Sequence, residues 1–169
     1  MHSKLFVIRP VDNKNAEKVD KDLVSKGLPA GADISGEVSM DTYFAQDFEQ
    51  IFGEYGSVVK KTDDGFVIEV RKDRIRDFFI EAAKNIEFRM REFRRKLETE
   101  NEADGAAAYY LPTGWRLRDV YDYRIYDAEY GIQEDIRSWV YHNMIGMQQT
   151  GQDSVRFKVT QIFDWYADL

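Results

Sequence analysis

The stretch SVVKKTDDGFVIEVR, residues 57–71, decides the fold. Two runs of β-prone residues, 57–61 and 66–71, flank the sequence Thr-Asp-Asp-Gly. The Asp-Gly step supplies the positive φ values that a tight β-hairpin needs. We therefore predict two antiparallel strands here, within a sheet that is antiparallel or mixed.

The segment after this hairpin is predicted to be one long helix. Asp73 stands where it can cap the helix, which runs to about Asn101. Apolar residues recur at spacings of three and four, the pattern of a helix with one buried stripe. The stripe consists of Ile75, Phe79, Ala82, Ile86, Met90, Phe93 and Leu97. Polar residues 101–105 end the helix, and residues 106–114 are expected to form a loop.

The segment before the hairpin is predicted to hold one strand and two helices. Residues 3–9 form a short apolar run that ends at Pro10, which indicates a strand. Residues 13–26 have apolar side chains at helical spacing, and a second helical stripe covers residues 42–55. Residues 27–36 hold three glycines and a proline, which favours a loop.

In the C-terminal part of the chain, the residue patterns indicate the secondary structure less clearly. Residues 115–126 suit either a strand or a helix, and their tyrosines favour a strand. A helix is predicted from Ile132 to Met147 because apolar residues recur at helical spacing there. Alternating apolar residues predict a last strand over residues 154–163.

Together these elements predict an α+β fold. If the two N-terminal helices count as one crossover, the order is β-α-β-β-α-β, the ferredoxin-like arrangement, with a C-terminal helix and strand as an extension. The sheet is expected to be mixed or antiparallel, with helices on one face. The 169 residues are expected to form a single domain, with a candidate internal boundary near residues 101–114.

The composition excludes several chemistries. The chain has no cysteine, which excludes disulfides, thiolate metal sites and a cysteine nucleophile. His2 and His142 have no second histidine at ligand spacing, and Glu37 stands where a P-loop would need lysine. We therefore expect no metal, no cofactor and no enzymatic activity. Neither a signal peptide nor a membrane span is predicted, so we expect a cytoplasmic protein.

The predicted hairpin carries one residue pattern that is similar to an enzyme site. A metal-dependent nuclease holds Mg²⁺ with two acids and a lysine on neighbouring strands. Asp63 or Asp64, with Glu69 and Arg71 or Lys72, is the nearest match. Side chains two positions apart in a strand lie on the same face, so Arg71 and not Lys72 shares the face of Glu69. The tight turn by itself explains the two aspartates.

Charge is distributed unevenly along the chain, whose formal net charge is −7. Residues 71–98 hold ten of the 24 Lys and Arg but six of the 31 Asp and Glu, a net charge of +4, which leaves −11 elsewhere. One hypothesis is a nucleic-acid-binding face on this helix, made by Lys84, Arg91, Arg94 and Arg95. The simpler interpretation is a solvated helix whose pairs Glu87–Arg91, Glu92–Lys96 and Arg94–Glu98 stabilise it locally.

Phe88 does not fit the buried stripe, because it falls on the polar side of the same helix. Either another part of the chain covers it or it is an exposed anchor for a partner. A homodimer with Phe88 at the contact is one form of the second interpretation.

Residues 119–135, DVYDYRIYDAEYGIQED, combine four tyrosines with six carboxylates and one arginine. Tyrosines give large contact areas, and carboxylates imitate phosphates in a basic groove. The simpler interpretation is that alternate tyrosines pack in the core and that the carboxylates lie at the solvent-exposed edge of this core. The predicted partner-binding residues are Tyr121, Asp122, Tyr123, Tyr126, Asp127, Glu129, Tyr130, Glu134 and Asp135, together with Phe88.

The function that we expect is binding to another protein without catalysis. The specific hypothesis is an acidic inhibitor that blocks a basic nucleic-acid-binding surface, in the manner of an anti-CRISPR or other anti-defence protein of a phage or mobile element. Direct binding to nucleic acid through residues 71–98 is the alternative, and the metal-dependent nuclease ranks last.

Overall fold

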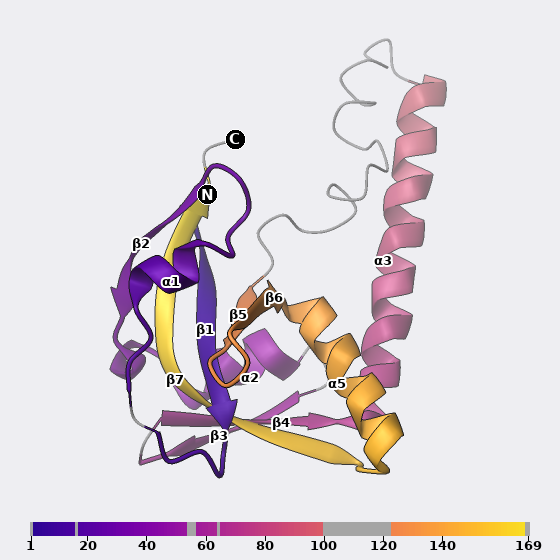
Figure 1. The fold of residues 1–169 in the computed structure, drawn as a ribbon. Coiled ribbons are helices and arrows are strands. Elements are labelled where there is room, and N and C mark those ends of the chain that lie inside the picture. The colour runs from indigo at the N-terminus through magenta and orange to yellow at the C-terminus, as the bar shows by residue number, and fades with distance from the viewer. Residues whose placement is uncertain (1, 16, 54–56, 64, 100–122, 168–169) are drawn as a thin grey trace.

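The computed structural model describes residues 2–15, 17–53, 57–63, 65–99 and 123–167. In this part of the chain seven strands form one mixed sheet, in the order β3-β4-β7-β1-β5-β6, with β2 paired to β7 beside this path (Figure 1). The strands are β1 (His2–Pro10), β2 (Ala32–Val38), β3 (Ser57–Thr62), β4 (Gly65–Arg71), β5 (Arg124–Asp127), β6 (Ile132–Asp135) and β7 (Ser154–Ala167). The helices are α1 (Lys21–Ser25), α2 (Ala45–Gly53), α3 (Lys72–Thr99) and α5 (Ile136–Thr150), with a 3-10 turn, η1, at Met40–Thr42.

Strand β7 organises the sheet. It is antiparallel to β1 along one side, and on its other side it pairs first with β4 and then with β2. A bulge at Thr160 shifts the register, because Val7 is opposite Gln161 whereas Ile8 is opposite Val159. A bulge bends a strand and increases its twist, and Figure 1 shows β7 curving strongly between its two sets of partners.

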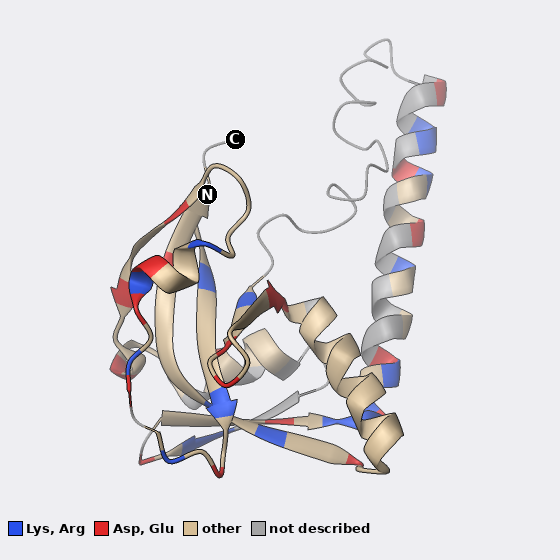
Figure 2. Ribbon diagram, viewed as in Figure 1, with Lys and Arg blue, Asp and Glu red and all other residues tan. Residues whose placement is uncertain are grey.

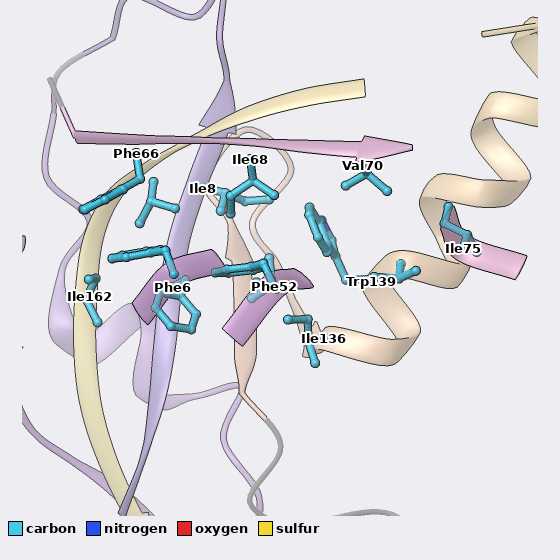
Figure 3. Packing of buried hydrophobic residues seen from close by; sticks show 14 of the residues in the cluster. Phe6, Ile8, Phe52, Phe66, Ile68, Val70, Ile75, Ile136, Trp139 and Ile162 are labelled. Carbon is cyan, nitrogen blue, oxygen red and sulfur yellow. The ribbon is translucent and has the colours of Figure 1, made fainter. Parts of the chain in front are cut away.

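The sheet buries side chains on both faces near β1. Phe6 and Ile8 point into a cluster with residues of α2, α5 and β4, and Figure 3 shows Phe52 and Trp139 among them. The rings of Phe48 and Phe66 stack in this cluster with centroids 3.8 Å apart. Leu5 and Val7 point into a smaller cluster with Val24 of α1 and Trp165 of β7. β1 is therefore a central strand covered on both sides, which explains its continuous apolar run.

The predicted hairpin is confirmed. Ser57 pairs with Val70 and Thr62 with Gly65, so β3 and β4 are antiparallel throughout. Gly65 has a φ of +130°, and a Cβ there would lie 2.9 Å from the carbonyl oxygen of Val159. Glycine is required here both by the backbone conformation and by the neighbouring strand.

The long helix is also confirmed, as α3. Ile75 is fully buried, but Met90, further along the predicted stripe, is 39% exposed. The prediction of burial is therefore wrong at Met90. Figure 1 gives the reason, because α5 lies beside the first part of α3 while the rest of α3 extends away from the sheet.

The helix predicted at 13–26 is largely wrong, since only Lys21–Ser25 is helical. Asn13 Oδ1 accepts a hydrogen bond from the backbone N–H of Asn15 (2.8 Å), and Asn15 Oδ1 accepts one from the N–H of Glu17 (3.0 Å). Asparagine side chains that bind backbone groups two residues ahead compete with a helix. α1 begins only where Asp20 caps it by accepting from the N–H of Asp22.

Two further boundaries differ from the predictions. The loop expected at 27–36 contains most of β2, whose Ala32 pairs with Ala167 of β7. The helix expected from Ile132 begins at Ile136, because residues 132–135 form β6. Residues 115–122 of the ambiguous stretch lie outside the described residues, and Arg124–Asp127 is a strand.

The α+β class and the mixed sheet are confirmed, since β5 is parallel to β1 and the other pairs are antiparallel. The ferredoxin-like order is not confirmed, because β2 is an additional strand within that order and β6 is an additional strand directly after it. The candidate boundary at 101–114 lies outside the described residues.

Candidate functional site

The β5–β6 hairpin brings together most of the described residues that the sequence marked for partner binding. Its turn is held by Asp127, whose Oδ1 accepts from the backbone N–H of Glu129 (2.9 Å) and of Tyr130 (3.4 Å). Gly131, with a φ of +65°, donates its N–H to the Asp127 carbonyl (2.8 Å) and completes the turn. These bonds fix the two residues at the tip, Glu129 and Tyr130, at the surface.

Apolar side chains are exposed on this hairpin and next to it. Tyr130 is 71% exposed and Ile132, the first residue of β6, is 55% exposed. Tyr141 on α5 is 45% exposed, and its ring lies beside that of His142. His142 in turn bonds to Glu134 of β6, so helix and hairpin are joined.

β6 is an edge strand, pairing only with β5 in the part of the chain that the structure describes. The other two edges expose charged side chains, whereas the two charged side chains of β6, Glu134 and Asp135, are half-buried and bound to α5. β3 carries exposed Lys60 and Lys61, and β2 carries exposed Asp33 and Glu37. Charges on an edge strand oppose pairing with another chain, whereas an exposed isoleucine such as Ile132 does not.

Three of the predicted carboxylates have local roles. Asp127 holds the turn, and Asp135 caps α5 by accepting from the Ser138 N–H (2.9 Å) and hydroxyl (2.8 Å). Glu134 Oε2 lies 2.6 Å from His142 Nδ1. Burial raises the pKa of Glu134, although the nearby His142 acts in the opposite direction. Glu129 is exposed at the tip.

The predicted tyrosines divide between core and surface. Tyr126 is buried in the smaller cluster, and Tyr123 packs against Phe6 in the larger one, with ring centroids 5.8 Å apart. Tyr121 and Asp122 lie outside the described residues. Among the described tyrosines of this group, Tyr130 is therefore the exposed one.

The opposite side of the hairpin holds buried polar groups that the sequence did not indicate. Arg124 donates from NH2 to the carbonyl of Gly27 (3.2 Å), and burial lowers the pKa of its guanidinium despite Asp135 and Glu134 nearby. A Cβ on Gly27 would lie 2.6 Å from Gln133 Oε1. These contacts join the hairpin to the segment after α1 and depend on pairings that no local pattern predicts.

A second polar cluster surrounds Asp164 of β7, and sequence analysis missed it. The carboxylate accepts from Lys4 of β1, from the Ser35 hydroxyl (2.7 Å) and lies 3.1 Å from His2 Nδ1. Ser35 is the extra residue of the β2 bulge, which aims its side chain at this carboxylate. Burial alone would raise the pKa of Asp164, but the hydrogen bonds from Lys4 and Ser35 outweigh it and lower the pKa overall.

The Asp164 cluster does not have the arrangement of a nucleophilic catalyst. Such a site needs a base beside the serine hydroxyl, with a third group that orients the base. Here the Ser35 hydroxyl and His2 both contact the carboxylate, and the lowered pKa makes that carboxylate a weak base. The cluster instead links β1, β2 and β7 at one end of the sheet.

The candidate nucleic-acid residues lie on α3 and are exposed (Figure 2). Ion pairs along the helix join Arg91 with Glu87 (2.7 Å), Arg94 with Glu98 (2.9 Å) and Arg95 with Glu92 (3.1 Å). Lys84 is exposed on the same helix. The predicted pairs Glu87–Arg91 and Arg94–Glu98 are confirmed, and Glu92 pairs with Arg95. The predicted pair Glu92–Lys96 involves a lysine side chain outside those that the structure describes.

Phe88 also lies on α3, where it is 62% exposed. It belongs to a different element from the hairpin, and sequence analysis had grouped it with the hairpin residues. Within the described residues nothing covers the greater part of its ring.

Two residues of the candidate nuclease site form ion pairs with residues outside it. Glu69 lies 3.8 Å from Arg156, and Arg71 pairs with Asp73 (2.7 Å). Across the described residues there is no group of three His, Asp or Glu side chains placed to hold a metal ion. No helix in the same residues combines the length and the apolar character needed to cross a membrane.

No protein-family model, curated protein or solved structure matches this chain.

Proposed function

We propose that the protein acts by binding another protein, without catalysis, through the β5–β6 hairpin. The observation that carries the proposal is the contrast between the three sheet edges. β2 and β3 expose charged side chains, whereas the charged side chains of β6, Glu134 and Asp135, are half-buried and bound to α5, and β6 exposes Ile132, with Tyr130 in the turn before it. An exposed edge strand gives a partner a row of backbone hydrogen bonds, and the side chains beside it give specificity.

The proposed partner is a protein with a basic surface, such as a nucleic-acid-binding protein that this chain inhibits. Glu129 is exposed beside Tyr130, and the Asp127 and Glu134 carboxylates are close in sequence on the same hairpin. A tyrosine with an acidic rim suits such a surface, because the aromatic ring supplies contact area and the carboxylates steer the encounter. The resulting complex should weaken as salt rises.

The test begins with capture of partners from a cell lysate on the immobilised protein, eluted with a salt gradient. A captured protein is then purified and its binding is measured against the double variant Tyr130→Ser, Ile132→Thr. Threonine keeps the β-branched shape that suits a strand, so the fold should persist. We expect the dissociation constant to rise at least about tenfold, the loss typical of a central aromatic contact.

Phe44→Ser is the matched control, because Phe44 is 69% exposed but lies before α2, on a different part of the chain. Its binding should equal that of the wild type. Equal binding by the hairpin variant and the wild type would exclude this surface, and binding that does not change with salt would exclude a basic partner.

A further inference from the structure

On the outward face of α3, one positive and one negative residue lie at equal distances on either side of an exposed aromatic residue. Phe88 is 62% exposed, while Ile75 on the same helix is fully buried. At about 100° per residue, Phe88 lies roughly 140° around the helix from Ile75. The Phe88 face is therefore turned away from the side by which α3 joins the core.

Two charged residues of opposite sign lie four positions from Phe88 on this face, while Arg91, three positions after Phe88, is paired with Glu87. Lys84 precedes Phe88 by four residues and Glu92 follows it by four, so both lie one turn away along the same face. Opposite charges thus stand at equal distances on the two sides of the ring.

We propose that this face binds a second copy of the chain, with two α3 helices crossing antiparallel at Phe88. A two-fold axis at this point brings the two Phe88 rings together. It also places Lys84 of each copy opposite Glu92 of the other, which gives two attractive pairs across the contact. A parallel pairing would oppose Lys84 to Lys84 and Glu92 to Glu92, so the charges select the antiparallel arrangement.

The ion pair of Glu92 with Arg95 does not prevent this contact. Arg95 donates to Glu92 from Nε (3.2 Å) and NH2 (3.1 Å), and both bonds end on Oε2. A carboxylate has about four acceptor sites, so Glu92 can bind a lysine and an arginine at once. An exposed pair of this kind contributes little stability, so little is lost if it rearranges.

Among the described elements, α5 and the sheet lie along the first part of α3 only. Figure 1 shows the later part of α3 extending beyond α5 and the sheet. A nucleic acid would be a poorer occupant of this face, because Glu92 would repel its phosphates and Glu87 already neutralises Arg91. One aromatic contact and two ion pairs give a weak dimer, which an experiment must be able to trap.

The first experiment uses the absence of cysteine. Phe88→Cys gives the full chain a single thiol, and a two-fold contact at residue 88 brings two such thiols together. Under mild oxidation we expect a disulfide-linked dimer to form much faster than in Tyr130→Cys, whose thiol replaces a ring on the hairpin that is even more exposed than Phe88. Equal rates in the two variants would overturn the proposal.

The second experiment is a charge exchange, followed by sedimentation equilibrium over a range of concentrations. Lys84→Glu and Glu92→Lys should each raise the dimer dissociation constant roughly tenfold or more, since each change replaces two attractions by two repulsions. The double variant should restore dimerisation. Failure of that restoration, or a wild type that stays monomeric at every concentration, contradicts the antiparallel contact. Association that disappears after nuclease treatment would instead identify nucleic acid as the ligand of α3 and would also overturn it.

Discussion

Both ends of the Gln161 side-chain amide bind the backbone of Val19. Gln161 Oε1 accepts from the Val19 N–H (2.7 Å), and Nε2 donates to the Val19 carbonyl (3.4 Å). Gln161 is buried and directly follows the β7 bulge at Thr160, where β7 passes from β4 to β2. The amide thus replaces the bonds of a neighbouring strand and fastens the segment before α1 to the sheet.

Gln161→Leu should therefore destabilise the fold. The leucine keeps the volume but leaves the Val19 N–H and carbonyl without their partner, which costs about 1–3 kcal/mol of unfolding free energy. Urea denaturation followed by circular dichroism measures this difference. Gln148→Leu, at an exposed position of α5, is the control and should change the stability little. Equal stabilities for the two variants would show that the Val19 contact is not needed.

Gly65→Ala tests the hairpin. The new Cβ would meet the Val159 carbonyl oxygen at 2.9 Å, and a φ of +130° is strained for alanine. We expect a loss of about 1–3 kcal/mol in thermal or urea unfolding. Gly146→Ala is the matched substitution, since no atom lies within 4 Å of its Cβ and it lies inside α5. That variant should gain about 0.5–1 kcal/mol, because alanine favours a helix. A stable Gly65→Ala protein would mean that the turn adopts another conformation.

The elements that could be predicted are those with a complete local signal. The Asp-Gly step, helical spacing in α3 and alternation at the start of β7 each lie within one segment of sequence. β2 could not be predicted, because its strand conformation depends on pairing with β7, as Ala32 does with Ala167. The helix at 13–26 failed because two asparagine side chains capture backbone N–H groups that helical spacing does not reveal.

The sequence indicated which segment holds the candidate site, but not the structural role of each residue in it. Tyrosines and carboxylates marked residues 119–135, yet the sequence does not tell that Asp127 closes a turn and Asp135 caps a helix. The edge position of β6 depends on the order of all the strands. The Asp164 cluster joins residues from both ends of the chain, such as Lys4 and Asp164, which no spacing rule connects.

The basic residues of α3 should contribute little to nucleic-acid binding. Arg91, Arg94 and Arg95 are each paired with a glutamate on the same helix, which offsets much of their charge. We expect no shift of a labelled duplex or single strand at low salt, and no change on substituting all three arginines by alanine. A shift that the triple alanine variant weakens for every sequence tested would revive the nucleic-acid alternative.

Asp164→Asn should make the free energy of unfolding less dependent on pH. The pKa of Asp164 is lowered in the folded state, so its ionised form stabilises the fold above the unfolded-state pKa of about 3.9, and this contribution is lost as pH falls through the folded pKa. At pH 7 the variant should be less stable by about 1–2 kcal/mol, because the bonds from Lys4 and Ser35 weaken when the acceptor is neutral. That difference should shrink towards pH 3 in urea titrations at several pH values. Asp12→Asn, at an exposed position, should follow the wild type throughout. A difference that stays constant with pH would mean that the Asp164 charge does not stabilise this end of the sheet.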